Sequence, residues 1–337
     1  MNGSGSSIPP GVCLAGTGMA VPAHVVSNDE LAKTVDTSDE WIAKRTGIRQ
    51  RCIGEPGDTV TSLATDALKQ AVTSAGLEPS QLDMVILATM TPEMITPSSS
   101  ARVAANIGAS PAGAVDISAA CSGFVYGMNM AAGLMKTGFY KNIGVIGVEM
   151  LSKLVNWEDR NTCVLFGDGA GAAVFSTCDD ATRGCLYQSM GSDGGRWHEL
   201  YCPRNEADLP ANGHGAPFNG QYNTLQMNGR EIYKFAVSTL QRTIDEALTH
   251  CNLKPSDLAV IIPHQSNARI IESAREKLGL TPERMCVNID RYGNTSAASV
   301  PIALHELTAE GRVKAGDYVL FVALGGGLTW ATSLWKV

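Results

Sequence analysis

The stretch Leu77-Glu-Pro-Ser-Gln-Leu-Asp-Met-Val-Ile86 decides the fold, because the chain contains it a second time as Leu253-Lys-Pro-Ser-Asp-Leu-Ala-Val-Ile-Ile262. The two copies lie 176 residues apart. The same offset places the apolar run 142–148 on the apolar run 318–324. A repeat of this length indicates a chain built from two similar halves.

Each half predicts the same alternation of helices and short apolar strands. In the first half we expect helices at 60–75, 99–107 and 122–137, and strands at 84–90, 114–118, 143–150 and 169–176. In the second half we expect helices at 230–250, 268–278 and 296–309, and strands at 259–262, 285–289, 317–324 and 328–335. Strands that alternate with helices and are apolar throughout are typical of parallel sheets covered on both faces. The sequence therefore predicts an α/β fold made of two duplicated βαβαβ-type halves.

We expect the two halves to pack helix layer against helix layer, with a division near residue 180. Residues 1–10 are rich in Gly, Ser and Pro and are interpreted as a flexible lead-in, since they lack the basic and apolar parts of a signal peptide. Residues 11–180 form the predicted N-terminal half and residues 181–337 the C-terminal half. The long polar connection 177–227 predicts one strand near 185–190 followed by an irregular cap.

Composition excludes several classes of protein. The net charge of −7 disfavours a large basic surface for nucleic acid, and no run of 18 apolar residues predicts a membrane span. The chain has nine cysteines but no CxxC, which disfavours a zinc site or a disulfide framework. Reduced thiols in a cytoplasm are the better interpretation.

The candidate nucleophile is Cys121, which follows the predicted strand 114–118 and begins the next helix. Sites in open α/β sheets lie beyond the C-terminal ends of strands. A helix N-terminus stabilises anions and lowers the pKa of a thiol. A buried cysteine with a purely structural role remains the alternative.

Three further groups follow strands in the second half. His264 comes after the strand 259–262, and Asn294, near the repeat's counterpart of Cys121, precedes a predicted helix. Asn294 is also a favoured helix cap, and the two roles are compatible. The three glycines 325–327 leave backbone N–H groups exposed, as an oxyanion site needs.

Several motifs together resemble β-ketoacyl-acyl-carrier-protein synthase III, a thiolase-fold family, over about residues 12–337. They are Asp36-Thr-Ser-Asp-Glu-Trp41-Ile-Ala-Lys-Arg45, Asp116-Ile-Ser-Ala-Ala-Cys121-Ser-Gly-Phe, Phe166-Gly-Asp-Gly-Ala-Gly-Ala172, His264-Gln-Ser-Asn267-Ala-Arg269, Asp290-Arg-Tyr-Gly-Asn294-Thr-Ser and Gly325-Gly-Gly-Leu-Thr-Trp330. The resemblance implies a five-layer αβαβα fold, a homodimer and a decarboxylative Claisen condensation. An acyl-CoA primer and malonyl-acyl carrier protein would be the substrates, and no metal or redox cofactor would be required.

The resemblance also assigns roles to residues. Cys121, His264 and Asn294 would form the catalytic triad, and the backbone N–H groups of Cys121 and Gly326 the oxyanion site. Residues implied to contact CoA or its pantetheine are Trp41, Arg45, Arg160, Met227, Gly229, Asn267 and Arg269. Residues implied to dock the acidic carrier protein are Lys234, Arg269, Arg275 and Lys277, although Glu276 interrupts this basic run. The structural alternatives are that Trp41 only anchors a helix and that these charges are ordinary solvated surface.

The resemblance further implies that residues 91–100 line the acyl pocket of the partner subunit. Ile95 or Thr96 in place of a bulky aromatic residue would leave room for a longer or branched primer. Comparison of acetyl-, isobutyryl- and octanoyl-CoA tests this hypothesis, because strict acetyl preference would contradict it.

Two other functions remain open from the sequence. One is a same-fold acyltransferase of secondary metabolism, which would use the same triad. The other is a Cys-His thioester hydrolase, in which water attacks the acyl-enzyme and Asn294 has no evident task.

Overall fold

Two mixed β-sheets form the framework of the protein. The computed structural model describes residues 10–209 and 220–337, so the predicted lead-in 1–10 lies, except for Pro10, outside the described residues. The first sheet has the order β1-β7-β6-β4-β5 and the second the order β11-β12-β13-β8. Their bounds are β1 Gly11–Ala20, β4 Met84–Ala88, β5 Gly113–Ile117, β6 Asn142–Met150, β7 Asp168–Cys178, β8 Gly184–Ser192, β11 Val260–Pro263, β12 Tyr318–Gly325 and β13 Thr329–Lys336.

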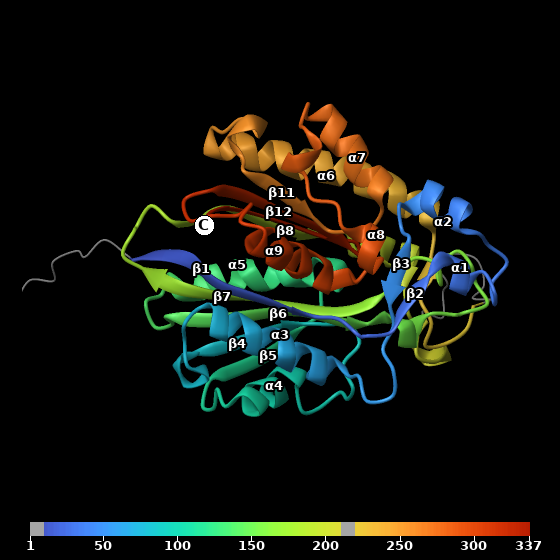
Figure 1. Cartoon of the computed structure of the whole chain (residues 1–337), viewed down its shortest axis with the longest axis horizontal. Coiled ribbons are helices and arrows are strands. Elements are labelled where there is room, and N and C mark those ends of the chain that lie inside the picture. The colour runs from blue at the N-terminus through green and yellow to red at the C-terminus, as the bar shows by residue number, and fades with distance from the viewer. Residues whose placement is uncertain (1–9, 210–219) are drawn as a thin grey trace, which may run out of the picture.

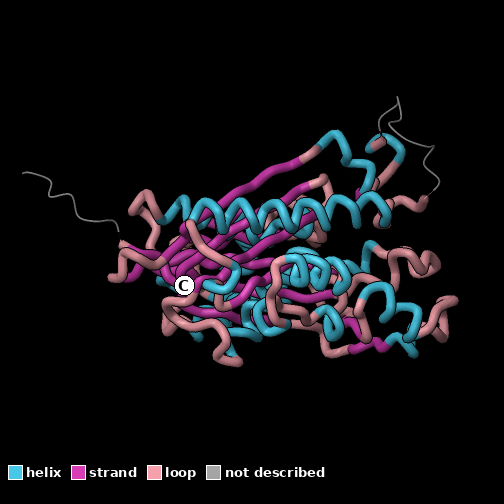
Figure 2. Tube along the Cα trace, turned by 90° about the horizontal axis from the view of Figure 1, so that it is seen from above, coloured by secondary structure: helices cyan, strands magenta, loops and turns pink. Residues whose placement is uncertain are grey.

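Helices and sheets alternate in five layers. The middle layer holds α5 (Gly123–Met135) and α9 (Ser299–Ala309), which share one apolar core with both sheets. The outer layers are α3 (Val60–Ser74) with α4 (Ser99–Ile107), and α6 (Gly229–Cys251) with α7 (Ala268–Lys277). Figure 1 shows this order from α4 to α7, and in Figure 2 the strands run between the helices. The thiolase-like α/β fold predicted from the sequence is confirmed.

The strand order explains the repeat. Strands β1, β7, β6 and β4 of the first sheet have counterparts in β8, β13, β12 and β11 of the second. In these two sheets the parallel pairs lie at one end of each sheet: β4 with β5 and β6, and β11 with β12. Strands β1 and β7, like β8 and β13, are antiparallel to their neighbours, so the expectation of parallel sheets is wrong for this part of each sheet.

The strand predicted at 285–289 is wrong. Met285 makes only an isolated bridge to Ile261, and Ile289–Tyr292 form the short helix α8. The reason lies in the side chain of Gln265, whose amide donates to Cys286 O at 3.1 Å and accepts from Asn288 N at 3.0 Å. One side chain thus satisfies the backbone groups that a neighbouring strand would have paired.

The sequence of β1 has no apolar pattern from which a strand could be predicted. Its glycines are needed because α3 packs directly on it: a Cβ on Gly16 or Gly18 would lie 2.2 Å from the carbonyl oxygen of Ala71 or Ala67. Small residues with weak strand preference therefore form this strand at the edge of the sheet.

Short elements surround the end of the molecule where the halves meet. They are β2 Val25–Ser27, α1 Asn28–Leu31, α2 Asp39–Thr46, β3 Gln50–Cys52, β9 Leu200–Tyr201 and β10 Gln226–Met227. The strand expected near 185–190 is β8, and the irregular cap after it is described except at 210–219. Among the described residues, no helix is long and apolar enough to cross a membrane.

Candidate active site

Three junctions between strands and helices meet at one cavity of about 170 Å³. Cys121 lies in the 3-10 turn Ala120–Ser122 directly before α5, His264 follows β11, and Asn294 precedes the 3-10 turn Ser296–Ala298. All three line the cavity, together with Met90, Leu165, Phe166, Leu200, Leu225, Met227, Gly229, Ile232, Tyr233, Phe235, Ala236, Ser266, Asn267, Ile270, Leu324 and Gly325. The structure therefore brings together the three residues that the sequence singled out.

Equivalent turns of the two halves set the geometry. Ala120 and Ser296, 176 residues apart, both have left-handed backbones, with φ of +47° and +49°. Such a conformation is costly for residues other than glycine and needs support from its surroundings. Support comes from close packing, since a Cβ on Gly325 would lie 2.7 Å from Cys121 N and one on Gly147 2.1 Å from Ala297 O.

The thiol of Cys121 is hard to ionise. Burial, and to a smaller extent the charge of the Glu149 carboxylate, raise its pKa to about 12. The hydroxyl of Ser296 and the backbone N–H groups of Cys121 and Gly326 act in the opposite direction, because they hydrogen-bond the thiolate. The net direction is opposite to that expected from a helix N-terminus alone, because desolvation outweighs it. The Gly326 N–H lies within hydrogen-bond reach of the Cys121 sulfur.

His264 is a neutral hydrogen-bond donor. Burial lowers its pKa to about 3. Its Nδ1 lies 2.7 Å from the hydroxyl oxygen of Ser299, which already accepts from the Gln265 N–H at 3.3 Å. The Ser299 hydroxyl can donate to Nδ1, and in that tautomer the proton of the neutral ring lies on Nε2.

Asn294 is held in one orientation. Its Oδ1 accepts the backbone N–H of Ser296 at 2.9 Å, and since an N–H can only donate, Oδ1 and Nδ2 cannot be interchanged. Its backbone bonds to Leu165 O and Gly167 N, which explains the Phe166-Gly motif in the sequence. The side chain closes a local turn with Ser296 and is not the helix cap considered from the sequence, because the cap position is held by Thr295. Its NH₂ group remains available for another acceptor.

Sequence reasoning missed three supporting residues: Ser299, Ser296 and Glu149. The two serines are unremarkable in a helix start. Glu149 did leave a signal, because it is a lone acid in the apolar strand β6, where it is fully buried.

Three of the predicted CoA residues form a cluster, whereas Met227, Gly229 and Asn267 line the cavity itself. The guanidinium of Arg45 lies 4.2 Å, and that of Arg160 5.3 Å, from the ring centroid of Trp41. Arg160 also donates to the carbonyl oxygen and carboxylate of Asp36. These distances are direct cation–π contacts that leave no room for a base between Trp41 and Arg160. Asn267 caps α7 and donates to Arg45 O at 3.0 Å, which joins the cluster to the cavity wall.

The predicted docking residues differ in whether they are free to bind an acidic partner. Lys234 pairs with Glu231 at 2.6 Å, and Arg275 pairs with Glu272 through both ends of its guanidinium. Arg269 and Lys277 are exposed on α7. The four residues therefore do not form one uniformly open basic patch.

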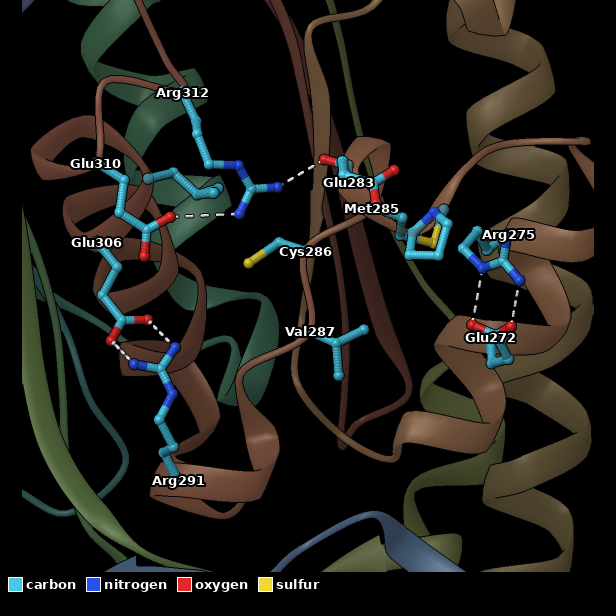
Figure 3. A pocket seen from close by; sticks show the side chains of 12 residues that line it. Glu272, Arg275, Glu283, Met285, Cys286, Val287, Arg291, Glu306, Glu310 and Arg312 are labelled. Carbon is cyan, nitrogen blue, oxygen red and sulfur yellow. Dashed lines mark hydrogen bonds and ion pairs between the residues drawn. The ribbon is translucent and has the colours of Figure 1, made fainter.

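A second cavity, of about 490 Å³, lies between α7 and α9. Figure 3 shows its walls, where Arg275 faces Glu272, Arg291 faces Glu306 and Arg312 faces Glu310. Its cysteine, Cys286, is buried, which raises its pKa to about 12. These paired charges and this thiol offer no nucleophile with a partner base, so this cavity is not the candidate active site.

Comparison with known proteins places the chain clearly. The family models described as 3-oxoacyl-[acyl-carrier-protein (ACP)] synthase III and its C terminal match residues 115–194 and 248–337. Beta-ketoacyl-[acyl-carrier-protein] synthase III of Caldanaerobacter subterraneus is 49% identical over 96% of this chain and 97% of its own, and that of Symbiobacterium thermophilum is 47% identical over 95% and 96%.

Two solved structures are similar over almost their whole lengths. The crystal structure of 3-oxoacyl-[acyl-carrier-protein] synthase III from Aquifex aeolicus has a TM-score of 0.89 and 44% identity, and covers 97% of this chain and 100% of its own. The priming beta-ketosynthase of the R1128 polyketide pathway has a TM-score of 0.90 at 33% identity, and covers 100% and 99%.

Proposed function

Because the chain belongs to the 3-oxoacyl-[acyl-carrier-protein] synthase III family, we propose that Cys121, His264 and Asn294 carry out its reaction in two halves. The activity is that of a β-ketoacyl-acyl-carrier-protein synthase III, an acyltransferase that initiates fatty acid synthesis. The first half loads an acyl primer from acyl-CoA onto Cys121. The second half condenses that primer with a malonyl unit carried by acyl carrier protein.

The loading half rests on the surroundings of the sulfur. The Cys121 thiolate attacks the thioester carbonyl, and the carbonyl oxygen becomes an oxyanion. The N–H groups of Cys121 and Gly326, which already stabilise the thiolate, are the donors for this oxyanion. Collapse of the intermediate expels CoA as the leaving thiol and leaves the acyl group on Cys121.

The condensing half rests on two neutral donors. Loss of CO₂ from the malonyl thioester develops an enolate, whose oxygen accepts from His264 Nε2–H and Asn294 Nδ2–H. Each preorganised donor of this kind lowers the barrier by roughly 3–4 kcal/mol. The carbanion then attacks the acyl-Cys121 carbonyl and gives the 3-ketoacyl product. No step in this scheme requires a metal or a redox cofactor.

The fixed orientation of the Asn294 amide is the observation that carries this proposal. A hydrolase would need a base that activates water, whereas in the proposed tautomer the Ser299 hydroxyl donates to Nδ1 and His264 carries its proton on Nε2. Both groups can donate to an anionic oxygen, and neither can accept a proton from water in this arrangement. The site therefore favours decarboxylative condensation over thioester hydrolysis.

The test of this function uses malonyl-carrier protein labelled at the free carboxylate. With acyl-CoA present, we expect release of labelled CO₂ and formation of a 3-ketoacyl product in equal amounts. Hydrolysis of acyl-CoA without CO₂ release would contradict the proposal. Loss of CO₂ release on substitution of Cys121, after normal folding, is the matched control.

Trp41→Ala should weaken CoA binding without stopping the chemistry. We propose that the CoA adenine displaces Arg160 from its contact with Trp41 and stacks on the indole. Base–aromatic stacking is worth about 1–3 kcal/mol. The expected result is a KM for acyl-CoA raised by about tenfold with kcat little changed, measured by initial rates. Trp41→Phe keeps an aromatic face and should lie between the two; a change in kcat alone would contradict this role.

A homodimer is proposed from the exposed edge of the first sheet. Strand β5 is the edge strand of that sheet, and its apolar residues Val115 and Ile117 are only half-buried. Unpaired edge strands of this kind pair readily with a second copy. Sedimentation should give twice the chain mass of 35.5 kDa; a monomer at micromolar concentration would contradict the proposal.

Ile95→Phe should narrow the choice of primer. Ile95 follows β4 and is 89% exposed, which is unusual for a large apolar residue and fits a contact with the partner's acyl pocket. A phenyl ring there would shorten the pocket. We expect the ratio of kcat/KM for acetyl-CoA to that for octanoyl-CoA to rise by about tenfold, since a few methylene groups are worth about 1–3 kcal/mol. An unchanged ratio would place Ile95 outside the pocket.

Carrier-protein docking is proposed for the exposed basic residues at the two ends of α7. Arg269 and Lys277 are available to an acidic partner, whereas Lys234 and Arg275 would first have to leave Glu231 and Glu272. The Lys234–Glu231 pair is largely exposed and such pairs are worth little, so its exchange is feasible.

A further inference from the structure

Glu149 is a buried acid at the active site with no part in the scheme above. It lies in β6 with no exposed surface. Its carboxyl group contacts the segment after β4, where the Met90 N–H lies 3.2 Å and the Thr91 hydroxyl 2.8 Å from Oε2. On its other side, the Ser296 hydroxyl lies 3.3 Å from Oε1. Every one of these contacts is a neutral group.

The charged neighbours of β6 are engaged elsewhere or lie outside the core. Among the described residues, no lysine or arginine forms an ion pair with Glu149. On β7, Asp168 accepts from Gly54 and Ser152. On α3, Asp66 and Lys69 are exposed. The titratable residues of the middle layer bond elsewhere: Tyr126 to Gly191 O, His305 to Thr17, and Glu306 to Asn288, Arg291 and Tyr292.

Cys121 is therefore the titratable group coupled to Glu149, and the cavity is also lined by the neutral His264 and by Tyr233. A buried carboxylate without a cation is costly, and such a group stays protonated to higher pH than usual. Burial raises the pKa of Glu149 to about 8. At neutral pH the carboxyl group is mostly uncharged.

Ser296 links this carboxyl group to the sulfur. Its hydroxyl reaches both Glu149 Oε1 and the Cys121 sulfur, yet it has one proton to donate. When Glu149 is ionised, that proton is drawn to the carboxylate. When Glu149 is protonated, its O–H can donate to Ser296, and the Ser296 proton is free for the thiolate.

We propose that Glu149 is a positioning residue that works in its neutral form, directing the hydroxyl of Ser296 to the Cys121 thiolate. The inference rests on the proposed function, since it assigns a purpose to the same nucleophile. Ionisation of Glu149 reverses the hydroxyl and adds a second negative charge beside the sulfur. Both effects oppose the thiolate, so the reactivity of Cys121 stops rising with pH once Glu149 ionises.

Glu149→Gln tests this, because the amide imitates the neutral acid and can donate to Ser296 at every pH. The measurement is the rate at which iodoacetamide alkylates Cys121 between pH 6.5 and 9.5, followed by mass spectrometry. In the unmodified protein the rate should rise with pH and level off near pH 8. In Glu149→Gln it should keep rising, and exceed the unmodified rate at pH 9 by up to about tenfold.

Two results would overturn the proposal. Profiles that coincide over the whole range would show that the charge of Glu149 is not felt by the thiol. A uniformly slower Glu149→Gln would show that the carboxylate itself is needed. Asp168→Asn is the matched control, since it removes another fully buried carboxyl from the neighbouring strand and should leave the profile unchanged. Circular dichroism checks the folding of each variant.

Two further variants distinguish the effect of the Ser296 hydroxyl from the effect of the Glu149 charge. Ser296→Ala and Ser296→Gly both remove the hydroxyl, but glycine suits a φ of +49° and alanine does not. Equal, several-fold slower alkylation of both at pH 7 supports the hydroxyl contact, whereas a normal rate in either one rejects it. Alkylation needs no acyl-CoA, so it measures the effect of Glu149 independently of acyl loading. If loading from acyl-CoA failed, that result would reject the proposed function but not the proposed role of Glu149.

Discussion

Cys121→Ala will accept no acyl group from acyl-CoA, and its condensing activity will fall by about 10⁴-fold or more. The reason is that the acyl-enzyme is an obligatory intermediate of the proposed scheme and alanine offers no atom to carry it. Cys121→Ser should behave similarly, because a buried hydroxyl is far harder to ionise than a thiol. Intact-protein mass spectrometry after mixing with acyl-CoA measures the adduct directly.

The matched control for this variant is Cys286→Ala. Cys286 is buried like Cys121 and its pKa is raised to the same value, about 12, but it faces the second cavity (Figure 3). Cys286→Ala should still take up one acyl group per chain on Cys121. An adduct that survives in Cys121→Ala, or disappears in Cys286→Ala, would move the nucleophile to another residue.

His264→Ala and Asn294→Ala should separate the two halves of the reaction. Each removes one donor to the enolate, so decarboxylation is expected to fall by about 10²–10³-fold. Loading of Cys121 does not use these donors and should proceed. The measurement pairs the acyl adduct, seen by mass spectrometry, with release of labelled CO₂ from malonyl-carrier protein.

Asn294→Asp sharpens this test. Aspartate can still accept the Ser296 N–H, which keeps the local turn, but it replaces the NH₂ donor by a negative oxygen facing the enolate. Its decarboxylation should therefore be slower than that of Asn294→Ala. A faster reaction in Asn294→Asp, or loss of loading in either single variant, would show that these residues do not act on the enolate.

Much of this arrangement could be predicted because the chain contains a similar order of helices and strands twice. The repeat at 77–86 and 253–262 fixed two strands in equivalent places, and each chemical residue then stood at the end of a strand or the start of a helix. The resemblance to a known family added the roles of the residues. The family and the fold expected from these motifs are confirmed.

Other features could not be predicted because they depend on contacts between distant residues. The missing strand at 285–289 is explained by one amide, that of Gln265, which no local pattern reveals. Strand β1 is hidden because helix packing selects small residues over apolar ones. The tautomer of His264 depends on Ser299, and the ionisation of Cys121 on burial, Ser296 and Glu149. None of these partners is a neighbour in sequence.

The paired left-handed turns at Ala120 and Ser296 have one more consequence. A perfectly symmetric duplication would set a second sulfur at position 297, opposite the first, and the two could oxidise or compete for one acyl group. Alanine at 297 breaks the symmetry, so the second turn carries no nucleophile. The Ser296 hydroxyl and the Asn294 amide are then free to interact with groups at the Cys121 turn. The two copies of the motif therefore have different functions.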